Sequence, residues 1–85
     1  MEDKTGLFDV NVVKKKLIAS TLDEVFSALK ERGYNPVNQI VGYLMSGDPG
    51  YISSHKEARS KISEFERTKI LELLVEEFIN KKWDI

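Results

Sequence analysis

Residues 33–55, which read GYNPVNQIVGYLMSGDPGYISSH, contain one acidic side chain and no Lys or Arg, although 32% of the 85-residue chain is charged. We call them the charge-poor segment. Water-facing positions on a helix are normally charged, because Lys, Glu, Arg and Asp are almost never fully buried without a partner. A helix that lacks them is hidden from water on more than one side. A chain of this length buries a small fraction of its surface and cannot enclose the segment completely. We therefore expect a second copy of the chain to cover part of it.

Apolar spacing predicts a first helix over residues 12–32, with Asn11 as its N-cap and Gly33 at its end. The apolar residues that recur there at intervals of three and four are Ile18, Leu22, Val25, Phe26 and Leu29. Asn35-Pro36 then predicts the start of a second helix, since Asn caps a helix and Pro suits its first turn. This helix extends to Gly47, and residues 46–50 form a tight corner rich in turn-forming residues.

A third helix is expected over residues 54–65, with Ser54 as its cap and with Ala58, Ile62 and Phe65 on one face. The last helix has the cleanest apolar stripe and ends near Lys81 and Lys82; the stripe comprises Ile70, Leu71, Leu74, Val75, Phe78 and Ile79. The pattern leaves open whether these two helices are continuous or separated by a kink near residues 66–68.

Together these elements predict an all-α fold: a compact bundle of about four helices with a helix-turn-helix-like arrangement. Residues 1–10 show no sustained periodicity and are expected to be a flexible N-terminal tail. Residues 11–85 are expected to form a single helical dimerisation domain.

Composition limits the classes of function. The chain has no Cys and a single His, His55, which rules out disulfides and disfavours a zinc site. Its 13 Lys and Arg against 14 Asp and Glu give a net charge of -1, which offers no field to attract a polyanion. No apolar run approaches the roughly 18 residues of a membrane span, and no secretion signal opens the chain. We expect a cytoplasmic protein without membrane insertion.

No constellation of residues favours catalysis. Ser53 and Ser54 stand beside His55, but a catalytic triad is a spatial arrangement that chain neighbours do not demonstrate. Glu76 and Glu77 read as a solvated helix face rather than as an acid and base pair. We expect a protein that is not an enzyme and that has no catalytic residue, cofactor or metal.

A nucleic-acid-binding function is the alternative. Residues 36–65 read as helix, turn, helix, and four nearby cations could contact phosphates: Lys56, Arg59, Lys61 and Arg67. Glu57, Glu64 and Glu66 are interleaved with them and cancel most of their field. Nucleic acid is therefore disfavoured as a partner.

The charge-poor segment supplies the candidate site, either as a dimer interface or as a core helix of a monomer. Asn38 and Gln39 could hydrogen-bond across an interface or face solvent. The candidate interface or motif residues are Tyr34, Asn35, Pro36, Val37, Asn38, Gln39, Ile40, Val41, Tyr43, Leu44, Asp48, Pro49, Tyr51 and Arg59.

The run GYNPVNQIVGYLMSGDPGYISSH, followed by Ala58-Arg59 and Glu66-Arg67, resembles the IreB family of small cytoplasmic proteins of Gram-positive bacteria. The resemblance extends from about Leu22 to Phe78. It implies an all-helical homodimer with a flexible N-terminal tail and a regulatory role without enzymatic activity. It also implies phosphorylation by a membrane-spanning Ser/Thr kinase with extracellular PASTA repeats, reversed by a cognate phosphatase, in control of cell-envelope stress and cephalosporin resistance.

By position, Thr5 matches one of the threonines phosphorylated in that family, and Glu2 falls where the other would be. The resemblance therefore implies one acceptor in this chain. Phosphorylation would add about -1.5 to -2 charges beside Glu2 and Asp3. We expect a signalling regulator that is switched at its tail and acts through a downstream protein that the sequence does not identify.

Overall fold

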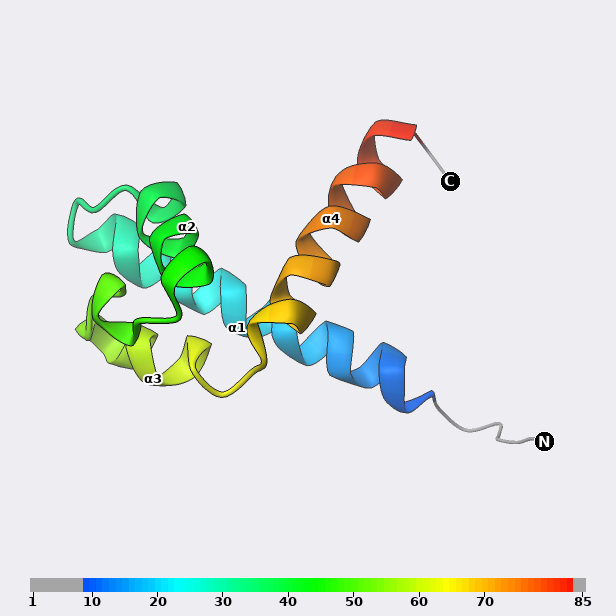
Figure 1. Ribbon diagram of the computed structural model, residues 1–85, viewed down its shortest axis with the longest axis horizontal. Helices are drawn as coiled ribbons and strands as arrows, with labels where there is room; N and C mark the ends of the chain where they lie inside the picture. Colours follow the sequence, from blue (N-terminus) through cyan, green and yellow to red (C-terminus); the bar gives the residue numbers. More distant parts are fainter. Residues whose placement is uncertain (1–8, 84–85) are drawn as a thin grey trace.

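The computed structural model describes residues 9–83 (Figure 1). The elements in chain order are α1 (Val10–Glu31), α2 (Pro36–Ser46), the short 3-10 helices η1 (Pro49–Tyr51) and η2 (His55–Glu57), α3 (Ala58–Ile62) and α4 (Arg67–Trp83). Within residues 9–83 there is no strand. The predicted all-α class with four α-helices is confirmed, while the expected tail of residues 1–10 lies mostly outside the described residues.

The first helix begins earlier than predicted. Asp9 is extended (φ -99°, ψ 123°), and its carboxylate accepts a hydrogen bond from the Asn11 backbone N–H at 2.8 Å. Asp9 is therefore the N-cap, and the prediction of Asn11 was wrong because two good capping residues stand two positions apart. The predicted end is confirmed: Gly33 adopts a left-handed conformation (φ +80°), and the Tyr34 N–H bonds back to the Leu29 carbonyl.

The second helix has the predicted start and end. The Asn35 side-chain oxygen accepts a hydrogen bond from the Asn38 N–H at 3.1 Å, and Pro36 occupies the first turn. Gly47 closes the helix in a left-handed conformation (φ +77°). Asp48 then turns the chain by accepting a hydrogen bond from the Gly50 N–H at 2.8 Å, which forms the predicted corner.

The third helix is shorter than predicted: only residues 58–62 are α-helical, against the expected 54–65. Lys56 (φ 49°) and Glu57 (φ 63°) are left-handed and interrupt the helix at its start. Ser54 makes no side-chain capping bond. At the other end, residues 63–66 form a turn, so that α3 and α4 are separate helices. This settles the question that periodicity left open.

The hydrophobic core lies where α1 packs against α2, α3 and the segment between them (Figure 1). Six core side chains have an exposed fraction of 0%: Val25, Leu29, Ile52, Ala58, Ile62 and, from the first turn of α4, Ile70. We call residues 18–66 the body. Burial of such side chains contributes about 1.5 to 3 kcal/mol each in transfer free energy, which makes this contact the main stabilising element of the chain.

The last helix leaves the body. Ile70 and Leu73 at the start of α4 are buried against α1, and the rest of α4 projects outward (Figure 1). Every side chain from Val75 to Lys82 is exposed. We call residues 71–82 the arm. None of the helices within residues 9–83 combines the length and apolarity that crossing a bilayer requires.

Candidate functional site

The charge-poor helix α2 is covered on one side only. Ile40 and Tyr43 are buried in the core of their own chain. On the opposite side, Val37, Val41 and Met45 follow one another at intervals of four and have exposed fractions of 64%, 51% and 81%. We call these three residues the α2 stripe. Their exposure leaves an apolar surface without a neighbour in residues 9–83.

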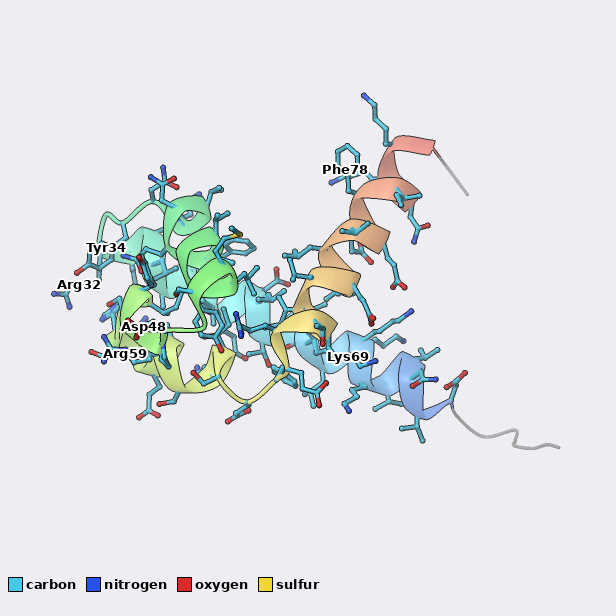
Figure 2. All side chains as sticks on the ribbon, viewed as in Figure 1. Arg32, Tyr34, Asp48, Arg59, Lys69 and Phe78 are labelled. Atoms are coloured by element: carbon cyan, nitrogen blue, oxygen red, sulfur yellow. The ribbon has the colours of Figure 1, made fainter. Side chains whose placement is uncertain are left out.

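A second apolar surface lies on the arm. Leu71, Val75, Phe78 and Ile79 are all exposed, with Phe78 at 63%, and we call them the α4 stripe. In Figure 2, Phe78 projects from α4 on the side toward which α2 lies. The sequence pattern placed these residues on one apolar stripe with Ile70 and Leu74, and of that stripe only Ile70 and Leu74 pack against the body. Periodicity identified the apolar face correctly and did not indicate which part of it is buried.

The remaining predicted site residues lie around α2 rather than on one surface. Tyr34 precedes the helix and is exposed, whereas Pro36 and Leu44 are partly buried. Gln39 accepts a hydrogen bond from the Ser53 N–H at 3.1 Å, and Arg59 donates one from Nε to the Ile52 carbonyl at 2.8 Å. Both side chains therefore bind the backbone of residues 52–53, which follow the corner, and each makes a stabilising contact within its own chain.

Tyr51 of η1 packs on Gly42 of α2. A Cβ added at Gly42 would lie 2.5 Å from Cδ1 of the Tyr51 ring, so that no other residue fits without moving the ring. The ring remains half-exposed, at 51%. The pairing fixes the corner of Asp48, Pro49 and Tyr51 beside α2, and it explains a glycine in mid-helix that costs about 1 kcal/mol relative to alanine.

Arg67, at the start of α4, is a residue that the sequence reading assigned only to possible phosphate contact. Its Nη1 donates a hydrogen bond to the Leu44 carbonyl at 2.9 Å, in the last turn of α2. A Cβ at Gly47 would lie 2.9 Å from the guanidinium carbon. Gly47 is thus favoured by its left-handed backbone, and a side chain there would also shift the end of the Arg67 side chain.

A charged network joins the end of α1 to η2. Glu31 lies 2.7 Å from His55 Nε2 and 2.8 Å from Lys56 Nζ, and Arg32 Nη1 lies 3.4 Å from His55 Nδ1. The hydrogen bond from Lys56, followed by the contact with His55, lowers the pKa of the Glu31 carboxyl below its ordinary value of 4.5. These contacts join the end of α1 to η2 and give His55 partners within the chain.

The four cations proposed to contact phosphates in the nucleic-acid-binding alternative all make ion pairs or hydrogen bonds within the chain. Lys56 pairs with Glu31 and Lys61 pairs with Glu24 at 2.9 Å. Arg59 and Arg67 each donate to a backbone carbonyl. Acidic partners thus neutralise two of these cations, and the other two donate to the backbone, so the structure offers no observation in favour of the helix-turn-helix alternative.

A small hollow of about 50 Å³ lies between α1 and α4. Its lining comprises Asn11, Lys14, Lys15, Ile18, Lys69, Glu72 and Leu73, and we call it the lysine groove. Lys15 Nζ lies 2.9 Å from a carboxylate oxygen of Glu76, which raises the pKa of Lys15, first by this hydrogen bond and then by the charge of Glu76. Figure 2 labels Lys69 where α4 meets α1.

Within residues 9–83, no three His, Cys, Asp or Glu side chains are grouped as metal ligands would be. Thr5, the predicted phosphorylation site, lies outside the described residues.

Comparison with known proteins agrees with this description. A family model described as IreB regulatory phosphoprotein matches residues 3–80. A UPF0297 protein of Clostridioides difficile (strain 630) is 54% identical over 80 residues, which is 94% of each of the two chains. The match reaches beyond the motifs around α2 and includes almost the whole chain.

Proposed function

The chain belongs to the IreB regulatory phosphoprotein family, and from this premise we propose that it is a non-enzymatic signalling regulator that acts by binding other proteins. The family match over residues 3–80 is the observation that carries the proposal. The two exposed apolar stripes support it, because contiguous apolar surface on a soluble domain marks a site of protein interaction.

The modified residue in this proposal is Thr5, phosphorylated in the cytoplasm by a transmembrane Ser/Thr kinase and restored by the cognate phosphatase. Thr5 lies within the matched residues 3–80, and the family is one of phosphoproteins. A phosphate there adds about -1.5 to -2 charges to a chain whose net charge is -1, so that one modification changes the charge of the protein substantially. The pathway in this proposal is the control of cell-envelope stress and cephalosporin resistance.

The active form in this proposal is a homodimer that buries the α4 stripe. Isolated helices shorter than about 12 to 15 residues are marginal in water, and helices in proteins owe most of their stability to packing of an apolar face. From Val75 onward, α4 has no such packing within residues 9–83. A second copy that lays the same face against it supplies the missing contact, in the self-complementary manner of a two-fold dimer.

Incubation with the cognate kinase and ATP, followed by mass spectrometry, tests the phosphorylation. We expect one phosphate on the wild-type protein, located at Thr5, and none on Thr5→Ala. A kinase that labels a control substrate but leaves Thr5 unmodified would remove the proposed switch. Capture from lysate with Thr5→Glu and Thr5→Ala as baits then compares the downstream proteins bound by the two forms.

Sedimentation of matched double variants tests the dimer. We expect Val75→Ser/Phe78→Ser to be monomeric at micromolar concentration, where the wild type is dimeric, and Val41→Ser/Met45→Ser on the α2 stripe to remain dimeric. The reverse result would place the interface on α2, as the charge-poor segment predicted. A wild type that is monomeric at every concentration would contradict the dimer itself.

A further inference from the structure

The segment between the corner and α3 has a strained backbone. Lys56 (φ 49°) and Glu57 (φ 63°) are left-handed in succession, and within residues 9–83 they are the only residues other than glycine with a positive φ. In this conformation the Cβ atom of an L-residue crowds the following carbonyl oxygen, which raises the energy of the folded state. Strain of this kind persists only where the surrounding structure enforces it. We call residues 53–57 the joint.

The sequence of the joint favours a helix instead. Ser54 is a good capping residue, and of the five residues that follow it, HKEAR, the Lys, Glu, Ala and Arg are good helix formers. The pattern accordingly predicts a helix from residue 54, whereas α3 begins at Ala58 and Ser54 makes no side-chain capping bond. Such a conflict between local preference and tertiary structure brings two arrangements of one segment close in energy.

Two partly buried hydrogen bonds hold the backbone that leads into the joint. The Gln39 side chain on α2 accepts a hydrogen bond from the Ser53 N–H at 3.1 Å, and Arg59 Nε donates one to the Ile52 carbonyl at 2.8 Å. Ile52 and Ala58, which stand on either side of the joint, are both fully buried. The chain must therefore connect two fixed points, and it does so through the left-handed pair.

The contact of the joint with the end of α1 is weaker. Lys56 pairs with Glu31, and the two side chains have exposed fractions of 60% and 52%. Exposed ion pairs contribute little to stability, whereas the hydrogen bond from Arg59 is charge-assisted and partly buried. This comparison favours Gln39 and Arg59 over Glu31 as the residues that enforce the bend.

We propose that the joint is a conformational switch: it is bent while Gln39 and Arg59 hold residues 52–53, and it becomes helical, with α3 beginning near Ser54, when these hydrogen bonds are released. Gln39 and Arg59 are positioning residues in this device. Gln39 lies on α2, the helix that carries the α2 stripe, so a molecule that moves this side chain as it binds α2 lengthens α3 by about one turn. Such a molecule favours the helical state by as much as it binds that state better.

NMR of the labelled full-length protein tests the two states. In the wild type, residues 56 and 57 should show the scalar couplings and the strong contacts between the amide and α protons that a positive φ produces. In Gln39→Leu/Arg59→Met, which nearly preserves the size of both side chains, most molecules should show helical values at residues 54–57.

A matched control changes the neighbouring positions on the same two helices. Asn38→Leu/Lys61→Met removes one amide from α2 and one cation from α3, and it leaves both hydrogen bonds to residues 52–53 in place. Residues 56 and 57 should therefore keep a positive φ in this variant.

The pKa of Glu31 provides a second readout. In the bent state, the hydrogen bond from Lys56, followed by the contact with His55, lowers this pKa below its ordinary value of 4.5. The helical state rotates both residues away from Glu31. The pKa of Glu31 should therefore rise toward 4.5 in the Gln39→Leu/Arg59→Met variant and stay low in the control.

Urea denaturation tests the strain with both hydrogen bonds in place, so that it applies even if the double variant does not fold. Glu57 is exposed, and Glu57→Gly relieves its left-handed backbone, which should raise the urea midpoint by about 0.5 M. Ser60 is exposed and lies within α3, so Ser60→Gly should lower the midpoint.

Two results would overturn the inference. If residues 56 and 57 keep a positive φ in the folded double variant, with the pKa of Glu31 unchanged, the bend does not depend on Gln39 and Arg59. If Glu57→Gly lowers the midpoint as Ser60→Gly does, the joint carries no strain. Both results are separate from the phosphorylation and the dimer of the proposed function, which have their own measurements.

Discussion

The body and the arm contain the same kinds of apolar residue, and they differ in what covers them. In the body, Leu29, Ile52 and Ile62 are fully buried by neighbours from the same chain. In the arm, Val75 and Phe78 are more than half exposed. The core of the body is thus covered within the single chain, although the α2 stripe on its surface is exposed, whereas the arm displays an apolar face without a neighbour in residues 9–83.

The polar contacts differ in the same way. Gln39, Arg59 and Arg67 each hydrogen-bond to the backbone and tie the segments of the body and the root of α4 together. Beyond Leu74, the arm is joined to α1 by the exposed pair of Lys15 and Glu76. Since exposed ion pairs contribute little, the arm beyond Leu74 is held less firmly to α1 than the segments of the body are to one another.

The largest expected effect comes from truncating the body. Ile62→Ala should lower the free energy of unfolding by about 2 to 5 kcal/mol, because it leaves a cavity in a fully buried position. Phe78→Ala, measured by urea denaturation at a dilution where the protein is monomeric, should change it by less than about 0.5 kcal/mol. Similar losses of unfolding free energy for the two variants would show that Phe78 is packed as tightly as Ile62. The contrast between a buried body and an exposed arm would then be wrong.

A smaller effect tests the contact between α2 and the root of α4. Gly47→Ala should destabilise the protein by about 1 to 2 kcal/mol for its left-handed backbone, with a further loss because the new methyl group displaces Arg67. Gly33→Ala is the matched control, since Gly33 has nearly the same φ and nothing within 4 Å of the added atom. In thermal denaturation, Gly47→Ala should have a lower melting temperature than Gly33→Ala. Equal melting temperatures would mean that Arg67 makes no specific contact beside Gly47.

The smallest effect concerns the charged network of the body. The pKa of Glu31 is lowered in the folded state, so its contribution to stability is fully present above its ordinary value of 4.5 and is lost as the pH falls through the lower folded value. Glu31→Gln should therefore be less stable than wild type at pH 7, and the difference should shrink by pH 3. Urea midpoints at the two pH values measure this. A difference that is unchanged by pH would assign the effect of Glu31 to packing.

Local sequence signals predicted the ends of helices correctly where a capping residue determines them. Asn35 and Pro36 start α2 and Gly33 ends α1, as expected from capping. The left-handed Lys56 and Glu57 had no signal, because neither residue type favours that conformation. The turn at residues 63–66 that divides α3 from α4 had none either, because apolar residues at helical spacing stand on both sides of it.

The candidate surface was predictable in part. The absence of charge singled out α2, but helical spacing places Val37, Ile40 and Val41 on one stripe, of which only Ile40 is buried. The α4 stripe was recognised as apolar, but the pattern did not indicate that its residues beyond Leu74 are exposed, since buried and exposed parts of an apolar face have the same spacing. Only the tertiary arrangement distinguishes the two cases.

The hydrogen bond from Arg67 to the Leu44 carbonyl has a consequence for recognition. It anchors the first residue of α4 to the last turn of α2, and the two helices each carry one of the exposed stripes. The separation of the stripes is therefore set by this anchor rather than by a loose linker, and a molecule that spans both must match a defined spacing. Selectivity among otherwise similar apolar ligands follows from that geometric requirement.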